Sequence, residues 1–323
     1  MKTAIGIDIG GTNSVFGIVD SAGKCLCSDT LRTDAYNDPE LFIVEFARRI
    51  DVLKTLLQFT PELIGIGIGA PKGNYFKGTV EFAPNLNWKG IVPIAEMVKR
   101  HFNLPVLLTN DANAAAVGEM LYGAARGMND FVVVTLGTGV GSGFVVNGKL
   151  LYGHDGFAGE LGHTIVDPDG RECGCGRKGC LETYASAKGI TRTVVEMLQN
   201  TDKKSILRKY TPADIDSRII YEAALQNDRL AVEAFDFTGK ILGIKLADMV
   251  AITSPEAIIL FGGLANAGEL IFKPVKFYME KYLLKIFRNK VKLIPSLLND
   301  DNAAVLGAAA LIWNETQGKI ITA

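Results

Sequence analysis

One histidine and three cysteines have spacing that suits a metal ion: His163, Cys173, Cys175 and Cys180, in the pattern H-x9-C-x-C-x4-C. One imidazole and three thiolates complete a tetrahedral set for structural zinc, with no position left open for water. Glycines between the cysteines permit the tight turns that such a site requires. Because the chain shows no signal-peptide pattern, crowded cysteines indicate metal binding rather than disulfides. We therefore expect a structural Zn²⁺ that orders this loop and performs no hydrolysis.

Two glycine-rich turns, Gly10-Gly11-Thr12 and Gly137-Thr138-Gly139, each follow a predicted strand. Glycine lets the backbone approach a ligand closely, and successive backbone N–H groups can then form a concave site for phosphate. Asp8, at the end of the first strand, is well placed to hold hydrated Mg²⁺. Each turn alone also fits an ordinary tight hairpin, but the pair, each with a threonine, predicts a bound nucleotide.

Asp111 is the predicted general base. Asn110-Asp111 ends a predicted strand, Val106–Thr109, and begins a predicted helix, Ala112–Tyr122. A carboxylate there can simply cap the helix. However, open α/β sheets place ligands at the carboxyl ends of their strands. Phosphoryl transfer to a hydroxyl needs one carboxylate to accept the proton, which is the role we expect for Asp111.

Two further carboxylates flank the cysteine cluster. Glu160 lies in Gly159-Glu160-Leu161-Gly162-His163, and Glu182 follows the last cysteine by two residues. Carboxylates tethered to an ordered loop suit hydrogen bonds from vicinal sugar hydroxyls. Solvated surface positions are the alternative interpretation.

The elements expected to position these residues alternate in an α/β order. Strands are predicted at Ala4–Ile9, Ser14–Asp20 and Lys24–Leu31 as an antiparallel meander, followed by helices over 39–59 and Ile91–Phe102. A second cycle begins with a strand at Phe131–Leu136, and Asn147-Gly148 is a strong hairpin signal. The length of 323 residues favours two domains. We expect a small N-terminal α/β domain of residues 1–112 plus 302–323, and a large α/β domain of residues 113–301 with the zinc loop.

The bulk composition excludes several classes of partner. The formal net charge is −1, which gives no electrostatic footprint for nucleic acid or a membrane surface. The longest apolar run, Ala303–Trp313, is about half the ~20 residues that a membrane span needs. A cytoplasmic protein is expected.

Taken together, these segments resemble the ROK family (repressors, open reading frames and kinases) over nearly the whole chain. The resemblance rests on the DIGGTN opening at residues 8–13, PNLNW at 84–88, NDANAA at 110–115, TLGTGVG at 135–141, GELGH at 159–163, CGCGRKGCLE at 173–182 and the late Gly262-Gly263. The order of these motifs and the cysteine spacing make the match specific.

The resemblance implies a two-domain, actin-like (ribonuclease H-like) hexokinase fold with its active site in an interdomain cleft. It implies an ATP-dependent sugar kinase in which Asp111 activates the 6-hydroxyl of a hexose. The residues implied to bind the sugar are Asn85, Asn110, Asp111, Glu160, His163 and Glu182, with His163 also ligating zinc. Those implied to bind Mg-ATP are Asp8, Gly10, Gly11, Thr12, Asn13, Thr138 and Gly139, with Gly262 and Gly263 under the adenosine. A homodimer or homotetramer is also implied.

Glucose is the expected substrate, while N-acetylmannosamine, N-acetylglucosamine, fructose, mannose and allose remain alternatives. Lys72 stands where the family commonly runs Pro-Gly directly, in a loop that approaches the sugar. A sugar-responsive repressor is a second hypothesis, although only seven residues precede Asp8, too few for a helix-turn-helix domain. A catalytically silent sugar-binding protein is a third, against which the presence of Asp111 and both glycine turns argues.

Overall fold

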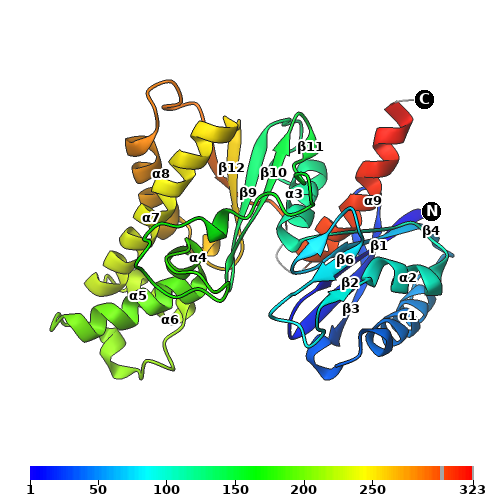
Figure 1. Cartoon of the computed structure of the whole chain (residues 1–323), viewed down its shortest axis with the longest axis horizontal. Coiled ribbons are helices and arrows are strands. Elements are labelled where there is room, and N and C mark those ends of the chain that lie inside the picture. Colours follow the sequence, from blue (N-terminus) through cyan, green and yellow to red (C-terminus); the bar gives the residue numbers. More distant parts are fainter. Residues whose placement is uncertain (299–301, 322–323) are drawn as a thin grey trace. The chain divides into compact units, whose positions relative to one another are not determined.

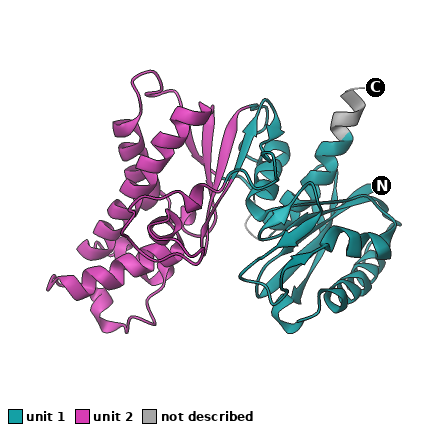
Figure 2. Ribbon diagram, viewed as in Figure 1, with its two compact units in different colours: residues 1–129, 143–159, 296–323 teal, residues 130–142, 160–295 magenta. Residues whose placement is uncertain are grey.

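The structure is a computed structural model that describes residues 1–298 and 302–321, and its contacts divide the chain into two compact units (Figure 1 and Figure 2). Unit 1 comprises residues 1–129, 143–159 and 296–323, and unit 2 comprises residues 130–142 and 160–295. The units are groupings by contact, so the expected domain limits, 1–112 with 302–323 and 113–301, stay a prediction.

Unit 1 is built on a five-stranded sheet in the order β3-β2-β1-β4-β8. Its strands are β1 (Lys2–Ile9), β2 (Asn13–Asp20), β3 (Cys25–Arg32), β4 (Glu62–Gly69) and β8 (Val106–Thr109). The first three form the predicted antiparallel meander, and β4 and β8 continue the sheet parallel to β1. The carboxyl ends of β1, β4 and β8 therefore meet at one edge of the sheet.

Helices cover both faces of this sheet (Figure 1). These helices are α1 (Pro39–Thr55), α2 (Ile94–Phe102), α3 (Asp111–Tyr122) and α9 (Ala303–Ile321). Ile5 and Ile7 of β1 share a fully buried cluster with Phe42 of α1 and Val98 of α2. Ala4 of β1 points to the other face and joins residues of α9. The alternation of β1 side chains thus forms two apolar layers, one on each face.

The predicted helix over Ile91–Phe102 was wrong in its first residues. Ile91–Val92 forms β7, which pairs with β6 (Thr79–Glu81), and β6 pairs in turn with β5 (Gly73–Asn74). Pro93 separates this strand from α2, since a residue before proline is biased towards extended backbone. The predicted hairpin at Asn147-Gly148 is confirmed. It joins β10 (Val140–Val146) to β11 (Lys149–Leu150), with φ of 51° and 71° at the two turn residues.

Unit 2 contains three parallel strands in the order β9-β12-β13: β9 (Phe131–Leu136), β12 (Ala257–Phe261) and β13 (Lys292–Pro295). Its helices are α4 (Glu182–Ala185), α5 (Ala187–Asn200), α6 (Ser217–Leu225), α7 (Arg229–Thr253) and α8 (Glu269–Tyr282). The long α7 packs against the other four (Figure 1).

Short 3₁₀ helices occur at Thr33–Ala35, Leu161–His163, Ile206–Lys209 and Ala265–Ala267. The segment from 153 to 179 has little regular structure. In the part of the chain that the structure describes, every helix is too short or too polar to cross a membrane.

Candidate active site and metal centre

Two acidic residues of unit 1 lie at the edge where three parallel strands end. The register of the sheet places Asp8 of β1 beside Gly69 of β4, and Gly69 beside Thr109 of β8. A methyl group built on Gly69 would lie 3.5 Å from Oδ1 of Asp8 and 3.7 Å from Cα of Asp111. Gly69 therefore leaves open the space between the two carboxylate-bearing segments.

Asp8 carries an unusual proton affinity for a carboxyl group. Burial, and then the negative charge of Asp111, raise the pKa of Asp8 to about 7. Two carboxylates in a partly desolvated site repel each other, and a divalent cation would relieve that repulsion. The arrangement suits Asp8 for a site that holds Mg²⁺.

The start of α3 separates the roles of Asn110 and Asp111. Asn110 is the N-cap of the helix, and its Oδ1 accepts a hydrogen bond of 2.7 Å from the backbone N–H of Asn113. Asp111 is the first helical residue, and its side chain is exposed. Its Oδ1 accepts a local hydrogen bond from the N–H of Ala112. Because Asn110 supplies the cap, Asp111 can serve as a proton acceptor without loss of the helix start.

The first glycine-rich turn lies close to Asn85. The N–H of Gly10 donates to the carbonyl of Asn13, and the N–H of Thr33 donates to the carbonyl of Thr12. A methyl group on Gly11 would lie 2.6 Å from the backbone oxygen of Asn85. The turn and Asn85 are thus neighbours within unit 1.

The second glycine-rich turn lies at the carboxyl end of β9, within unit 2. The N–H of Gly137 donates to the carbonyl of Gly139, which closes the turn. The N–H of Ala187, the first residue of α5, donates to the carbonyl of Gly137 over 2.9 Å. Gly262, with φ of 98°, packs against the backbone of Leu136. The predicted pair Gly262-Gly263 is therefore adjacent to this turn.

The predicted metal ligands come together in unit 2. One donor atom from each of His163, Cys173, Cys175 and Cys180 lies within 4.8 Å of the others. The Sγ atoms of Cys175 and Cys180 are 3.6 Å apart, and Sγ of Cys173 is 3.7 Å from Nδ1 of His163. Zn–S bonds of about 2.3 Å place the ligand atoms of a tetrahedral site roughly 3.8 Å apart, so the donor set fits zinc.

The two ring nitrogens of His163 face different partners. Nδ1 lies towards Cys173 and is 3.6 Å from Oε1 of Glu182, whereas Nε2 is 3.8 Å from Oε2 of Glu160. Glu182 also accepts a hydrogen bond of 2.9 Å from the thiol of Cys173. A methyl group built on Gly139 would lie 2.7 Å from Oε2 of Glu182. Glu182 thus lies between the cysteine cluster and the second glycine-rich turn.

The proton affinities of the three thiols differ. Burial raises the pKa of Cys173 and of Cys180 above the usual range. Partial burial also acts on Cys175, but hydrogen bonds from the side chain and backbone of Arg177 outweigh it and lower the pKa to about 7. A thiol that ionises readily beside an arginine is a good first ligand for a metal cation.

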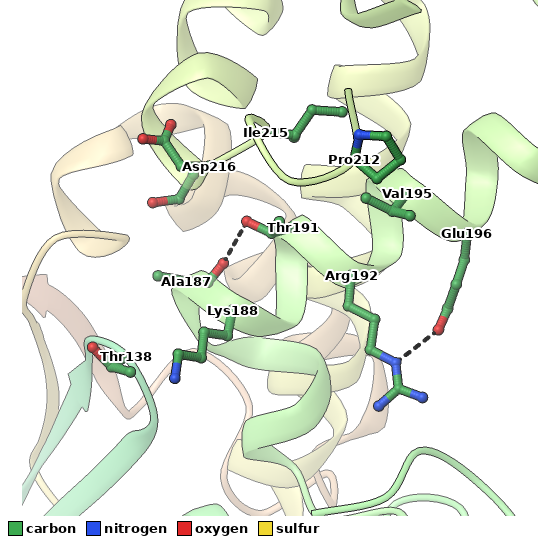
Figure 3. Close-up of a pocket in the computed structure, with 11 residues that line it drawn as sticks. Thr138, Ala187, Lys188, Thr191, Arg192, Val195, Glu196, Pro212, Ile215 and Asp216 are labelled. Carbon is green, nitrogen blue, oxygen red and sulfur yellow. Dashed lines mark hydrogen bonds and ion pairs between the residues drawn. The ribbon is translucent and has the colours of Figure 1, made fainter. Parts of the chain in front are cut away.

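A pocket of about 540 Å³ adjoins the second turn (Figure 3). Thr138 lies at one side of it, and α5 contributes Lys188, Thr191, Arg192 and Glu196. The segment 212–217 forms the opposite wall. The pocket combines charged groups with an apolar surface, which is the character of a small-molecule site.

Comparison with known proteins places this arrangement in a family. The ROK family profile matches residues 4–315. A glucokinase from Thermotoga maritima is 36% identical over 319 residues, which cover 97% of this chain and 98% of the relative. The chain belongs to the ROK family.

Structural and regulatory relatives support the same membership. A ROK family glucokinase from Streptomyces griseus, solved in complex with glucose and AMPPNP, superposes with a TM-score of 0.81 at 34% identity. That match covers 96% of this chain and 98% of the solved one. A xylose repressor from Bacillus subtilis is 30% identical, and the match covers 96% of this chain and 76% of the repressor. The predicted fold class, the α/β actin-like fold of ROK sugar kinases, is confirmed.

The structure of this ROK chain adds residues that the sequence motifs did not identify. The pocket walls from α5 and from 212–217 lie outside the sequence motifs that carry the family resemblance. The sequence does contain one local indication of where α5 begins. Ser186 is its N-cap, and the serine hydroxyl accepts a hydrogen bond from the N–H of Gly189. Within each unit the predicted residues do cluster, while their roles remain predictions.

Proposed function

We propose that this chain is an ATP-dependent hexose kinase that phosphorylates the 6-hydroxyl of glucose. The observation that carries the proposal is the exposed Asp111 carboxylate, which follows a helix cap supplied by Asn110 and lies next to Asp8 at the strand edge. Relatives named glucokinase that match nearly end to end support both the reaction and the sugar.

In this proposal Asp111 accepts the proton of the 6-hydroxyl. The hydroxyl oxygen then forms a bond to the γ-phosphorus of ATP as the bond to the β,γ-bridging oxygen breaks, and ADP leaves. The proton remains on the carboxyl group of Asp111. General-base assistance of this kind contributes about 10²–10⁴-fold to the rate.

The two glycine-rich turns bind the ATP phosphates through backbone N–H groups: Gly10, Gly11, Thr12 and Asn13 in unit 1, Thr138 and Gly139 in unit 2. Gly262-Gly263 supports the adenosine, and the pocket beside Thr138 offers the nucleotide further polar and apolar contacts. Asp8 would hold Mg²⁺, which neutralises charge on the phosphates when it is bound. The closeness of Asp8 to Asp111 supports this role, because a bound cation would offset the repulsion between the two carboxylates.

The remaining polar residues bind the sugar: Asn85, Asn110, Glu160, His163 and Glu182. The orientation of His163 supports a dual role, in which Nδ1 ligates the metal and Nε2 donates to a sugar hydroxyl. A metal on Nδ1 leaves the proton on Nε2, which makes that nitrogen a donor. Glucose is the favoured hexose, with N-acetylhexosamines, fructose, mannose and allose as the panel against which it is tested.

Zinc is the proposed structural ion, held by His163, Cys173, Cys175 and Cys180. It would supply no chemistry to the reaction and would fix the loop that carries Glu160 and Glu182.

The test is ADP release by the purified chain with Mg-ATP across the hexose panel, with the Asp111→Asn variant beside it. Strong turnover on glucose, with kcat lower by about 10³-fold in Asp111→Asn and an unchanged melting temperature, would support the proposal. Turnover that persists in the variant would remove Asp111 as the base.

The xylose repressors among the relatives make a sugar-responsive binding protein the second candidate. That function predicts sugar binding by calorimetry with no ADP release from any sugar of the panel. The same preparation therefore distinguishes the two functions.

A further inference from the structure

Arg171 is an almost fully buried cation that lies two residues before the first cysteine of the metal cluster. Its side chain is 7% exposed, which is rare for an arginine and requires several partners. Its guanidinium stacks over the ring of Tyr184 at 4.5 Å, and its backbone N–H donates to the hydroxyl of Tyr184. Arg171 therefore fixes the cysteine loop against α4.

The same guanidinium reaches across to α5 through both of its terminal nitrogens. Nη1 donates to the carbonyls of Thr183 and Gly189, at 2.7 and 3.2 Å. Nη2 donates to Oγ1 of Thr193 at 2.9 Å and to Oε2 of Glu196 at 2.5 Å. Gly189, Thr193 and Glu196 span two turns of α5, so one side chain fixes the position of the first half of this helix.

Helix α5 in turn supports two features of the nucleotide side. Its first N–H, on Ala187, binds the carbonyl of Gly137 in the second glycine-rich turn. One carboxylate oxygen of Glu196 accepts a hydrogen bond from Arg171, and the other accepts one of 3.0 Å from Nε of Arg192. Glu196 and Arg192 both line the pocket (Figure 3). The described contacts thus form a chain from the cysteine loop through Arg171 and α5 to the turn and the pocket wall.

We infer that Arg171 is a positioning residue for the nucleotide, through which an ordered cysteine loop holds the Gly137–Gly139 turn and the α5 wall of the pocket in place. This inference rests on the proposed ATP site, and it assigns to the metal loop a role beyond sugar binding. It predicts that loss of the Arg171 side chain weakens nucleotide binding more than sugar binding. Arg171 binds α5 directly through Gly189, Thr193 and Glu196, whereas of the proposed sugar-binding residues it has only Glu182 nearby, through the adjacent Thr183 and Tyr184.

The test measures binding of AMPPNP and of glucose separately by calorimetry, which requires no turnover, together with zinc content by elemental analysis. In Arg171→Met, the Kd for AMPPNP should rise about tenfold, as expected when buried charge-assisted hydrogen bonds are lost. The Kd for glucose should change less than about twofold, and zinc should remain at one per chain as in the unaltered protein. Arg171→Lys keeps the charge but not the planar guanidinium group, so its Kd for AMPPNP should lie between those of the unaltered protein and Arg171→Met.

A second variant covers the case in which Arg171→Met does not fold. Glu196→Gln leaves the cysteine loop and the carbonyl contacts of Arg171 intact, and should raise the Kd for AMPPNP about threefold. Arg48→Met is the matched control, since it removes an exposed arginine bound to Glu45 on the surface of α1. Equal losses for both ligands, loss of zinc, or unchanged AMPPNP affinity in the folded variants would overturn the inference. If the unaltered chain binds AMPPNP but transfers no phosphate to a sugar, the proposed kinase activity is refuted and the inference about Arg171 is not.

Discussion

The two glycine-rich turns have similar sequences but are supported in different ways. Gly10–Asn13 joins two antiparallel neighbours, β1 and β2, whose inward residues such as Ile7 and Phe16 are fully buried. Gly137–Gly139 follows β9 and is held from outside by the first N–H of α5, with Glu182 beside it. Both turns therefore join buried neighbouring strands, and they differ in the segment that binds them from outside. The first turn accepts a hydrogen bond from Thr33, directly after β3 of the same sheet, whereas the second accepts one from α5, which Arg171 connects to the cysteine loop.

This difference separates what each turn depends on. A turn bound within its own sheet depends on the packing of that sheet, which resists added volume. A turn held by hydrogen bonds, a buried arginine and a metal loop is sensitive to the state of that loop. We therefore expect chemical treatment of the metal cluster to affect unit 2 selectively.

The largest effect should follow from Cys180→Ser, which removes a fully buried ligand. The variant should lose zinc and about 3–5 kcal/mol of stability, at the high end for single substitutions. Hydrogen exchange should accelerate in α4, α5 and the Gly137–Gly139 turn and stay slow in β1 and β2. Cys25→Ser, the same change outside the cluster, is the control. Equal acceleration in both turns would contradict the comparison.

The second prediction compares the same substitution in the two turns. In Gly11→Ala the new methyl group would meet the backbone oxygen of Asn85 at 2.6 Å, so main chain must move. In Gly139→Ala it would meet Oε2 of Glu182 at 2.7 Å, the end of a side chain that can rotate. We expect kcat/KM to fall about 10²-fold in the first variant and about tenfold in the second. The reverse order would show that the first turn is the more adaptable one.

The smallest expected effect concerns pH. Burial opposes ionisation of Glu196, but hydrogen bonds from Arg171 and the charge of that arginine lower its pKa below the usual 4.5. A carboxyl group with a depressed pKa contributes stability above its unfolded value, and loses it as pH falls through the folded value. Because Glu196 is partly exposed, Glu196→Gln should lower the melting temperature by only about 1–2 °C at pH 7. The difference between the two melting temperatures should shrink as the pH falls below 4.5. Glu222→Gln, which removes a carboxylate in an exposed pair with Arg218, should change the melting temperature less than Glu196→Gln does at pH 7.

The sequence predicted the features that local pattern determines. The meander, the Asn147-Gly148 turn and the approach of three cysteines to His163 each follow from residues close together in the chain. The division of labour between Asn110 and Asp111 was open, because an aspartate in that position can cap the helix itself. The structure assigns the cap to Asn110.

The support of the second turn was beyond prediction for a physical reason. Arg171 contacts acceptors on α5 that lie 18 to 25 residues away, and only the packing of the two segments brings them together. Likewise, Ile91–Val92 forms a strand because it pairs with β6, and the pattern of apolar residues in the sequence does not reveal this pairing. Contacts that form only when distant segments pack together cannot be predicted from the spacing of residues in the sequence.

The position of α9 in the core of unit 1 has a consequence for biosynthesis. Val305, Ala309 and Ile312 cover Ala4 and Val19 at one face of the first sheet. A ribosome delivers these helix residues only after all of unit 2 has been translated. During translation, one apolar face of the first sheet therefore stays uncovered until α9 is made. The segment 160–295, in contrast, contains most of unit 2 and can form its core as soon as it is translated. Chaperone protection during translation should be needed most by the part of the chain that emerges first.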